Sequence, residues 1–445
     1  MKKSLLSVMC LFSALLANAQ DTPAITLTAD VDGNPREIAV SATAAGTKVT
    51  VDWGDGNLVT SDELAVEDGW TTTTLSGTPA GEGVIKIYGT GIARLEANSV
   101  YVTDDDGNKS IQVGITAADV TNAADLQYLV LNSNKLTSID VSNNTALQKL
   151  DLSNNQLTSI DVTKNTQLTN LTLSNNQLTA IDLSNNPSIK TLYLSQNKFS
   201  GSLDLSAVTA LKSAYLLDNE LTDVNFGDNT TLSYISLNNN KISSIDVSKQ
   251  TGLVKGSLFL INNEIADGKN IVLPEGAKTL NISKNKLTFA TMPELTIAKN
   301  VTYAPQQDIE LAKETNTIDL SAQATVGENA TTFTVYTYNE NAAEGEEAAT
   351  ALTADTDYKI ANGVITFENI PELPVYVAME NASYDKFTGD NVLKTTVTKI
   401  VKETTGISAV QKNSIKSESF NLSGMKADKS FKGIIISNGK KYIAK

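Results

Sequence analysis

The pattern of hydrophobic and polar positions repeats itself between Leu126 and Leu287. Three units read LQYLVLNSNKLTSIDVSNNTA, LQKLDLSNNQLTSIDVTKNTQ and LTNLTLSNNQLTAIDLSNNPS, and they start at Leu126, Leu147 and Leu168, so the period is 21 residues. Five further units carry the same pattern with substitutions and start at Ile189, Leu211, Leu232, Lys255 and Ala277. Self-similarity at such a period indicates an array of stacked units. The sequence therefore predicts eight coils of one solenoid.

The apolar positions of each unit predict a short strand with one buried face. Leu129 and Leu131 alternate with polar or outward-facing residues, which is the period of a strand. A single coil cannot bury this face alone, so the stability of the array has to come from stacking between neighbouring coils. We expect one continuous internal column, formed by Leu129, Leu150, Leu171, Leu192, Ala214, Ile235, Leu258 and Leu280.

Each unit also carries an asparagine at a fixed place, although asparagine disfavours strands. A buried amide costs free energy unless it is hydrogen-bonded. We therefore expect each of these side chains to bond main-chain groups at the turn, or the next asparagine of the ladder. The predicted structural ladder consists of Asn134, Asn155, Asn176, Asn197, Asn219, Asn240, Asn263 and Asn285.

The consensus L-x-x-L-x-L-x-x-N-x-L resembles the leucine-rich repeat family, and in particular its bacterial secreted branch. The resemblance implies a solenoid with a parallel sheet on the concave side and turns or short helical pieces on the convex side. It also implies that ligands, mostly proteins, bind on the concave sheet. The expected fold class is mainly β, a leucine-rich repeat solenoid with a period of about 21, flanked by a β-rich N-terminal cap and a C-terminal immunoglobulin-like β-sandwich.

Strand alternation indicates which side chains face outward on the concave sheet, namely those two, four and six places after the leading apolar residue. Aromatic residues occupy this face in four consecutive coils of a chain that is only 6% aromatic. Exposed clusters of tyrosine and aliphatic residues are typical of binding centres. Tyrosine and phenylalanine are also good strand residues that stack on their neighbours, and this alternative stays open. The candidate ligand-binding residues are Tyr128, Tyr193, Tyr215, Leu217, Tyr234, Phe259 and Ile261.

Residues 20–83 alternate in β fashion and predict a β-rich N-terminal domain. The piece VDWGDGN, Val51 to Asn57, resembles the core strand and turn of a polycystic-kidney-disease-type β-sandwich. Asp52 and Asp55 could be metal ligands, but a turn needs Asp and Gly for local reasons, and we favour the turn.

The solenoid is predicted to span residues 84–297. VIKIYGTGIARL, Val84 to Leu95, has the apolar spacing of the repeat, with Thr90 where asparagine belongs. Ala117–Leu126 also matches Ser138–Leu147 position for position. Between these two matches, the run DDDGN at 104–108 lacks the ligand spacing of a calcium loop and predicts a solvated hairpin tip.

Residues 298–403 show short strands separated by polar turns, which predicts a β-sandwich. They resemble the immunoglobulin-like modules that follow leucine-rich repeats in internalin-type surface proteins. We expect this module to cover the open end of the solenoid.

Residues 404–445 form a basic tail. From Gly406 onward, the chain has eight lysines and only two acidic residues, Glu418 and Asp428, which gives a net charge of +6. The pieces FNLSGMK and FKGIIISNGKKYIAK resemble the C-terminal sorting domain of proteins exported by the type IX route, which implies passage through the outer membrane and attachment at the surface. The alternative is a terminal β-hairpin with a turn at Asn438-Gly439 that completes the preceding domain.

The N-terminus and the composition indicate export. Residues 1–19 combine Lys2 and Lys3 with an apolar run and end in Ala-Asn-Ala, the pattern of a secretory signal, and no other segment predicts a membrane span. A formal net charge of −15 argues against nucleic acid as a partner. Cys10 lies within the signal and is the only cysteine, so the mature chain has no disulfide.

The sequence predicts no catalytic site, no metal site and no cofactor. The chain has no histidine, no glycine-rich phosphate loop and no metal-ligand cluster. We expect a secreted or surface-exposed, adhesin-like binding protein whose concave sheet recognises an extracellular protein, peptide or glycan. One alternative is a surface-coat or stalk protein that self-associates, and another is a carbohydrate-active enzyme with two catalytic carboxylates.

Overall fold

The computed structural model describes residues 22–97, 100–103, 109–343, 347–402, 420–421, 433–437 and 440–444. The predicted signal segment and the DDDGN run lie outside these residues. The chain divides into two compact units. The first unit consists of Met1–Ile309 with Thr325–Asn329 and Glu380–Leu393, and the second consists of Glu310–Ala324, Ala330–Met379 and Lys394–Lys445.

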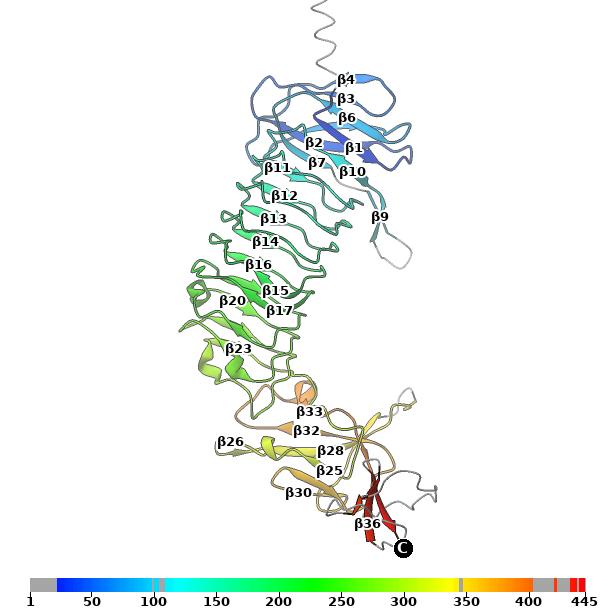
Figure 1. Ribbon diagram of the computed structural model, residues 1–445, viewed down its shortest axis with the longest axis vertical. Helices are drawn as coiled ribbons and strands as arrows, with labels where there is room; N and C mark the ends of the chain where they lie inside the picture. The colour runs from blue at the N-terminus through cyan, green and yellow to red at the C-terminus, as the bar shows by residue number, and fades with distance from the viewer. Residues whose placement is uncertain are drawn as a thin grey trace, which may run out of the picture. The chain divides into compact units, whose positions relative to one another are not determined.

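The first unit contains a solenoid whose strands form one long sheet (Figure 1). Eight short strands pair in parallel, one from each predicted coil, and residues at the same place in successive repeats are direct partners in the sheet. All eight residues of the predicted internal column are at most 1% exposed. The predicted fold class is therefore confirmed for the solenoid. The strands are β11 (Tyr128–Val130), β12 (Lys149–Asp151), β13 (Asn170–Thr172), β14 (Thr191–Tyr193), β16 (Ser213–Tyr215), β18 (Tyr234–Ser236), β20 (Ser257–Phe259) and β22 (Thr279–Asn281).

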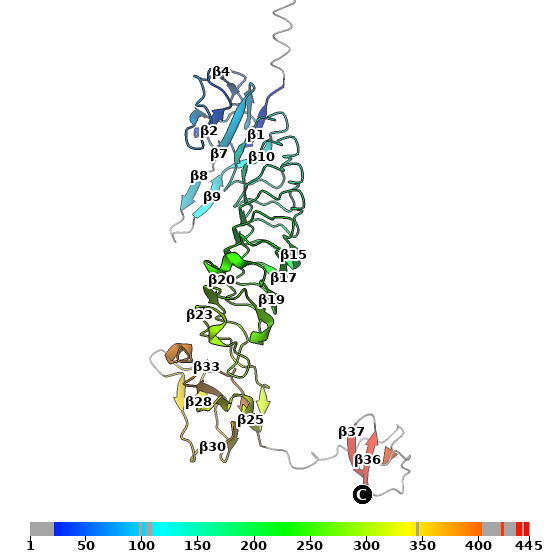
Figure 2. The same cartoon turned by 90° about the vertical axis from the view of Figure 1, so that its left-hand side faces the viewer.

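Two more parallel strands extend this sheet, β7 (Ile92–Ala97) next to β11 and β23 (Asn300–Thr302) next to β22. The other side of the coils carries two strand pairs, β15 (Ser200–Asp204) with β17 (Glu220–Asn225) and β19 (Ile245–Asp246) with β21 (Ile271–Val272). Figure 2 shows β15, β17 and β19 across the solenoid from β20 and β23. The coils also contain the 3₁₀ helices η2 (Thr251–Val254), η3 (Gly268–Asn270) and η4 (Leu295–Ile297).

Each asparagine of the predicted ladder bonds main-chain groups of two coils, as Asn176 illustrates. Its Oδ1 accepts a hydrogen bond from the amide of Leu157 at 2.9 Å, and its Nδ2 donates to the carbonyl oxygens of Leu152 at 2.9 Å and Leu173 at 3.1 Å. The bonds therefore run within one coil and to the coil before it. In the coil after Asn285, Gln306 takes the same role, because its Nε2 donates to the carbonyl oxygen of Ile282 at 2.8 Å.

A second asparagine ladder, which the sequence analysis did not identify, runs along the returning side of the coils. The Nδ2 of Asn165 donates to the carbonyl oxygens of Val141 and Asn144, both at 2.9 Å. Asn186 repeats this arrangement one coil later and bonds the carbonyl oxygens of Val162 and Asn165. The sequence signal is the last asparagine of SNN, TKN and SNN, which recurs with the period. Four asparagines take this role, namely Asn144, Asn165, Asn186 and Asn229.

The N-terminal part is a two-sheet arrangement that shares one sheet with the solenoid. A five-stranded sheet has the order β10-β1-β6-β3-β4, while β2 and β5 continue the solenoid sheet beyond β7. Trp53 is 8% exposed and packs against Gly77, where an added Cβ would lie 2.2 Å from the indole ring. The strands are β1 (Ile25–Ala29), β2 (Arg36–Ala42), β3 (Thr50–Asp52), β4 (Leu58–Thr60), β5 (Thr73–Gly77), β6 (Val84–Tyr88) and β10 (Ile115–Asp119).

The turn after β3 uses its aspartates as hydrogen-bond acceptors. Asp52 Oδ1 accepts hydrogen bonds from the amides of Gly54 at 2.9 Å and Gly56 at 3.0 Å. Asp55 Oδ1 accepts one from the amide of Asn57 at 2.9 Å. These are the bonds that close a tight turn, so both aspartates have a local structural role.

The prediction that the solenoid begins at Val84 is wrong. Strand β6 pairs antiparallel with β1 and β3 in the N-terminal domain, and Gly89 and Gly91 turn the chain at positive φ into β7. Thr90 lies in this turn and does not occupy an asparagine position. Apolar alternation is the same in an antiparallel strand and in a repeat strand, so the pattern alone could not separate them.

The first solenoid coil therefore starts with β7. The paired strands β8 (Val100–Thr103) and β9 (Lys109–Val113) follow it in the chain and precede β10. Asn134 bridges to this coil, because its Nδ2 donates to the carbonyl oxygen of Ala97 at 2.8 Å and its Oδ1 accepts from the amide of Ile115 at 2.8 Å.

Aromatic side chains cover the far end of the solenoid within the first unit. Tyr384 and Phe387, from the segment Glu380–Leu393, pack on Phe289 and Tyr303 of the last coils with ring centroids 5.4–5.8 Å apart. The hydroxyl of Tyr303 donates to Asp385 at 2.8 Å, and burial raises the pKa of Tyr303 to about 12. These rings remove from water the apolar interior that an open solenoid end would expose.

The second unit is built from β strands. One sheet contains β25 (Thr317–Asp319), β31 (Val364–Phe367) and β30 (Tyr358–Ala361), and another contains β29 (Ala349–Ala351), β28 (Thr332–Tyr338) and β32 (Val375–Glu380). The immunoglobulin-like assignment stays a prediction. In the tail, β35 (Phe420–Asn421), β36 (Gly433–Ser437) and β37 (Lys440–Ala444) pair antiparallel, while the expected turn residues Asn438 and Gly439 lie outside the described residues.

Replacing Asn176 by alanine is expected to lower the free energy of unfolding by about 1–3 kcal/mol, because the buried amide of Leu157 loses its acceptor. The carbonyl oxygens of Leu152 and Leu173 each lose one of two side-chain donors and keep the bonds from Asn155 and Asn197. Urea denaturation followed by far-UV circular dichroism measures the change. Gln177→Ala, at the exposed neighbouring place, is the control and should change the value by less than about 0.5 kcal/mol. Equal effects of the two substitutions would contradict the structural role of the ladder.

Replacing Phe387 by alanine is expected to destabilise the covered end of the solenoid by about 3 kcal/mol, since the ring is 1% exposed. Because each coil contacts mainly its neighbours, the loss should be local. Hydrogen exchange with mass spectrometry should show faster exchange in β22 and β23 and unchanged exchange in β12 and β13. Uniformly faster exchange along the sheet would argue against a separate covering role.

Candidate functional site

The concave face of the solenoid, which is the solvent-facing side of its parallel sheet, carries a stack of four aromatic rings. Tyr193 and Tyr215 are stacked with centroids 4.3 Å apart and an interplanar angle of 11°. Tyr215 and Tyr234 follow at 4.8 Å and 34°, and Tyr234 and Phe259 at 5.5 Å and 49°. We call these four residues the aromatic ladder.

The strands position the ladder through their register. Tyr193 and Tyr215 are direct partners in the sheet, and Phe259 is the partner of Ser236 in the same row. Tyr234 belongs to the adjacent row, where it pairs with Ser213 and Ser257, and it reaches across to contact its aromatic neighbours. The rings therefore form one continuous contact over four coils although two rows supply them.

The ladder is half-buried. The faces of Tyr193 and Tyr215 cover one another, while the other two pairs make tilted contacts. Burial raises the pKa of Tyr193 above its usual value, with a further rise from the neighbouring Tyr215, and burial likewise raises the pKa of Tyr234. These two phenols are therefore protonated hydrogen-bond donors at neutral pH. The faces of Tyr215 and Tyr234 lie against other rings, so this part of the ladder presents ring edges and hydroxyl groups outward.

The other candidate residues divide into two groups. Leu217 and Ile261 are half-exposed and lie six residues after the first residue of their coils, beside the aromatic ladder. Tyr128 lies three coils before Tyr193 and does not belong to the ladder. Its ring is covered by Arg94, whose guanidinium carbon lies 4.3 Å from the ring centroid, a cation–π arrangement.

Arg94 belongs to a buried ion-pair cluster that the sequence analysis missed. Its Nε and Nη2 donate to the two carboxylate oxygens of Glu67, each at 2.8 Å, and its Nη1 donates to Glu96 at 2.7 Å. Burial alone raises the pKa of Glu67, but hydrogen bonds from Arg94 and Ser41 outweigh this, so that the pKa lies below its usual value. No local sequence signal joins these residues, because 27 positions separate Glu67 from Arg94.

This cluster holds the loop Glu67–Thr71 over the N-terminal end of the concave face, because Ser41 and Arg94 are partners in the solenoid sheet. Within the loop, Asp68 accepts hydrogen bonds from the amides of Trp70 at 2.8 Å and Thr71 at 2.7 Å. Hydrogen bonds from Thr71 lower the pKa of Asp68 to about 2. The turn presents Trp70 with 91% of its surface exposed.

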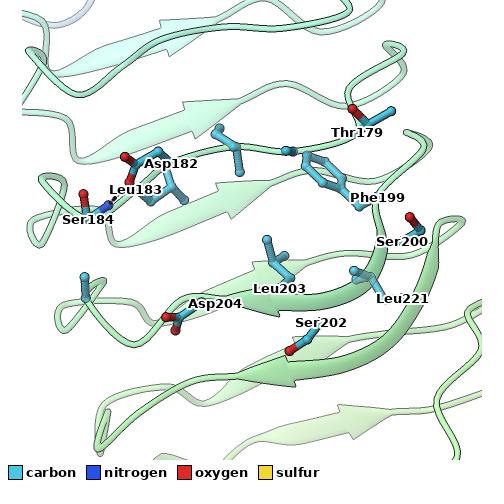
Figure 3. Close-up of a pocket in the computed structure, with 13 residues that line it drawn as sticks. Thr179, Asp182, Leu183, Ser184, Phe199, Ser200, Ser202, Leu203, Asp204 and Leu221 are labelled. Carbon is cyan, nitrogen blue, oxygen red and sulfur yellow. Dashed lines mark hydrogen bonds between the residues drawn. The ribbon is translucent and has the colours of Figure 1, made fainter.

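A groove of about 350 Å³ lies on the other side of the coils (Figure 3). The coil that begins at Ile189 has one residue more than the period, and Gly201 takes a φ of +71° where the register of β15 shifts. Figure 3 shows Asp182 and Asp204 on this groove. Each accepts a bond from the amide two residues further on, from Ser184 at 2.9 Å and Ser206 at 3.0 Å, so both have a local turn role.

The remaining repeat aspartates behave in the same way. Asp140, Asp161 and Asp246 each accept a hydrogen bond from the amide two residues on, at 2.9 Å. Hydrogen bonds from these Ser or Thr residues hold the pKa of each carboxyl below its usual value. Among the described residues, no group of three or more His, Cys, Asp and Glu is placed to hold a metal ion. Over the same ranges, no helix combines the length and apolarity needed to cross a membrane.

Comparison with known proteins points to leucine-rich repeats. The family described as Leucine Rich repeats (2 copies) matches residues 125–164. No curated protein sequence matches the chain. The functional domain of InlJ from Listeria monocytogenes is similar at 16% identity and a TM-score of 0.28, over 70% of this chain and 91% of that one. Internalin C2 from Listeria monocytogenes gives 20% identity and a TM-score of 0.31, over 48% and 80%.

A third similar structure is the leucine-rich repeat domain of APL1, with 26% identity and a TM-score of 0.35. The match covers 43% of this chain and 52% of that one. The family match and the in-register parallel sheet agree on the repeat type.

The Glu67→Gln variant is expected to be less stable than the wild type by about 3 kcal/mol at neutral pH, because it leaves Arg94 buried without its anionic partner. The folded-state pKa of Glu67 is lowered, so its contribution is present above the unfolded value of about 4.5 and is lost as the pH falls through the folded value. Urea unfolding measured between pH 3 and pH 7 should show the two proteins converge in acid. A difference that does not depend on pH would refute the charge pairing.

Proposed function

We propose that this chain is a secreted or surface-exposed, non-enzymatic binding protein that recognises a macromolecule on the concave face of its leucine-rich repeats, as an adhesin does. Residues 1–19 supply the predicted export signal, and the basic tail supplies the predicted sorting sequence. The aromatic ladder is the proposed centre of the binding face, with Leu217 and Ile261 beside it.

The observation that carries this proposal is the half-exposed aromatic stack on a sheet face where most of the other outward positions carry polar residues. Ser, Thr and Asn satisfy the outward positions elsewhere, at Asn170, Thr172 and Thr279 for example, so the coils do not require rings there. Half-exposed tyrosines that are held in place by their neighbours lose little conformational freedom on binding. Such rigid aromatic groups are typical anchors of protein interfaces.

Stacking also stabilises the sheet, and the experiment has to separate the two contributions. Each ring pair contributes about 0.5–1.5 kcal/mol beyond its buried area. A change in stability alone therefore does not identify a binding face, whereas a loss of binding in a folded variant does.

Replacing Tyr193, Tyr215, Tyr234 and Phe259 by serine is expected to abolish binding while the solenoid stays folded at 25 °C. Arrays of extracellular proteins and glycans, probed with the chain from Gln20 onward, measure binding, and circular dichroism checks the fold. The matched control replaces Lys149, Asp151, Asn170 and Thr172 by serine on the same face and should bind as the wild type does. Unchanged binding of the ladder variant would refute the proposed surface, and concentration-dependent self-association of the wild type without any other partner would favour a structural role.

A further inference from the structure

Lysines gather along one rim of the concave face, at the ends where the strands begin. Four of them immediately precede a strand, namely Lys190 before β14, Lys212 before β16, Lys278 before β22 and Lys299 before β23. Lys255 lies two residues before β20. We call these five residues the lysine row.

The lysine row is exposed and electrostatically uncompensated. All five side chains are exposed, and none forms an ion pair with a described residue. Some other exposed lysines in this half of the solenoid are paired, for example Lys241 with Glu220 at 2.7 Å and Lys249 with Asp228 at 2.6 Å. A one-sign row is unexpected in a chain with 50 acidic and 35 basic residues. It creates a positive potential along this rim that attracts an anionic partner.

The lysine row and the aromatic ladder begin at the same coil. The three preceding coils have Gln127, Gln148 and Thr169 at the position of the row. The first lysine, Lys190, lies three residues before the first ladder residue, Tyr193. Charges in the N-terminal half of the face are instead balanced, as in the pair Arg94 and Glu96. Two independent features thus mark the same half of the sheet.

The ladder geometry disfavours a sugar as the ligand of this half. Sugars stack on open ring faces, but the faces of Tyr215 and Tyr234 lie against their neighbours. The exposed parts are ring edges, which carry partial positive charge, and phenol hydroxyls, which donate hydrogen bonds. Such a surface suits aliphatic side chains and acceptor oxygens such as carbonyls and carboxylates.

We propose that the ligand of this face is a protein with an extended acidic segment, whose carboxylates pair with the lysine row and whose apolar side chains lie on the aromatic ladder. This inference rests on the proposed function and adds the chemistry of the partner. An extended chain fits because both features run across the strands as parallel lines. The row spans five strand spacings of about 4.8 Å, or roughly 24 Å, which an extended segment of about seven residues covers.

The test begins with a random octapeptide library displayed on phage and selected on the chain from Gln20 onward. Enriched sequences should combine Asp or Glu with Leu, Ile, Val or Phe. One enriched peptide is then synthesised with a fluorescent label, and its affinity is measured by anisotropy. Chondroitin sulfate and polygalacturonate serve as anionic polysaccharide probes in the same assay.

Three multiple-substitution variants separate the contributions of the lysine row and the aromatic ladder to peptide affinity. The triple variant Lys190→Gln, Lys212→Gln and Lys278→Gln should lower the affinity for the peptide at least about tenfold. It should also reduce the salt dependence of this affinity, because charges at the rim attract the peptide through solvent and are screened by salt. Lys198→Gln with Lys241→Gln and Lys286→Gln removes the same charge at the opposite rim and should change affinity less than about twofold. The four-serine ladder variant should not bind the peptide.

The outcomes separate the inference from the function on which it rests. Binding that requires the ladder but not the lysine row overturns only the acidic-partner inference. Binding that survives loss of the ladder overturns the proposed binding face itself. Failure to enrich any peptide, or enrichment without acidic residues, refutes an extended acidic segment. Lysine-dependent binding of either polysaccharide without peptide binding would assign the face to acidic glycans instead.

Discussion

The structure depends on one recurring interaction, the bridge that an asparagine carboxamide makes between consecutive coils. A side chain such as Asn155 accepts from the amide of Leu136 at 2.9 Å and donates to the carbonyl oxygens of Leu131 at 2.9 Å and Leu152 at 3.0 Å. A shift of one residue between coils would break the two bonds that cross from one coil to the next and leave the buried amide of Leu136 unpaired, at about 1–3 kcal/mol. The ladder therefore determines register as well as stability. Register in turn decides which side chains become neighbours on the surface.

The properties of the concave face follow from that register. Because equal places in successive coils are direct partners, a residue type that recurs in the sequence becomes a line across the sheet. Strand spacing of about 4.8 Å is close to the contact distance of aromatic rings, so tyrosines in neighbouring coils stack on each other. The observed centroid distances of 4.3–5.5 Å agree with this spacing. The same geometry that stabilises the rings hides their faces and leaves edges and hydroxyls for recognition.

The sequence was sufficient for the features that recur with the period and insufficient for those that do not. The eight repeat strands and the internal column follow from the 21-residue pattern, as does the position of each ladder ring. The boundary at Val84 failed because β6 has the same alternation as a repeat strand yet pairs with β1. The Glu67–Arg94 pair joins a loop to a strand far along the chain, and no local pattern marks such a contact. The second asparagine ladder also recurs with the period, but its asparagines stand among other polar turn residues, and the sequence pattern alone did not distinguish them.

The two halves of the concave face have different physical character, and this contrast bears most directly on function. At the N-terminal end, Arg94 is buried and paired on both sides and covers the ring of Tyr128, so the charge and the aromatic surface there are already used within the protein. At the C-terminal end, the aromatic ladder is half-exposed, and the five lysines of the lysine row form no ion pair with a described residue. The repeat does not require rings at these positions, because the coil that begins at Leu168 has Asn170, Thr172 and Ser174 there and its strand pairs in the same sheet. The apolar exposure and the uncompensated charge are unfavourable for the isolated protein, and both are relieved by a ligand that carries apolar groups and carboxylates.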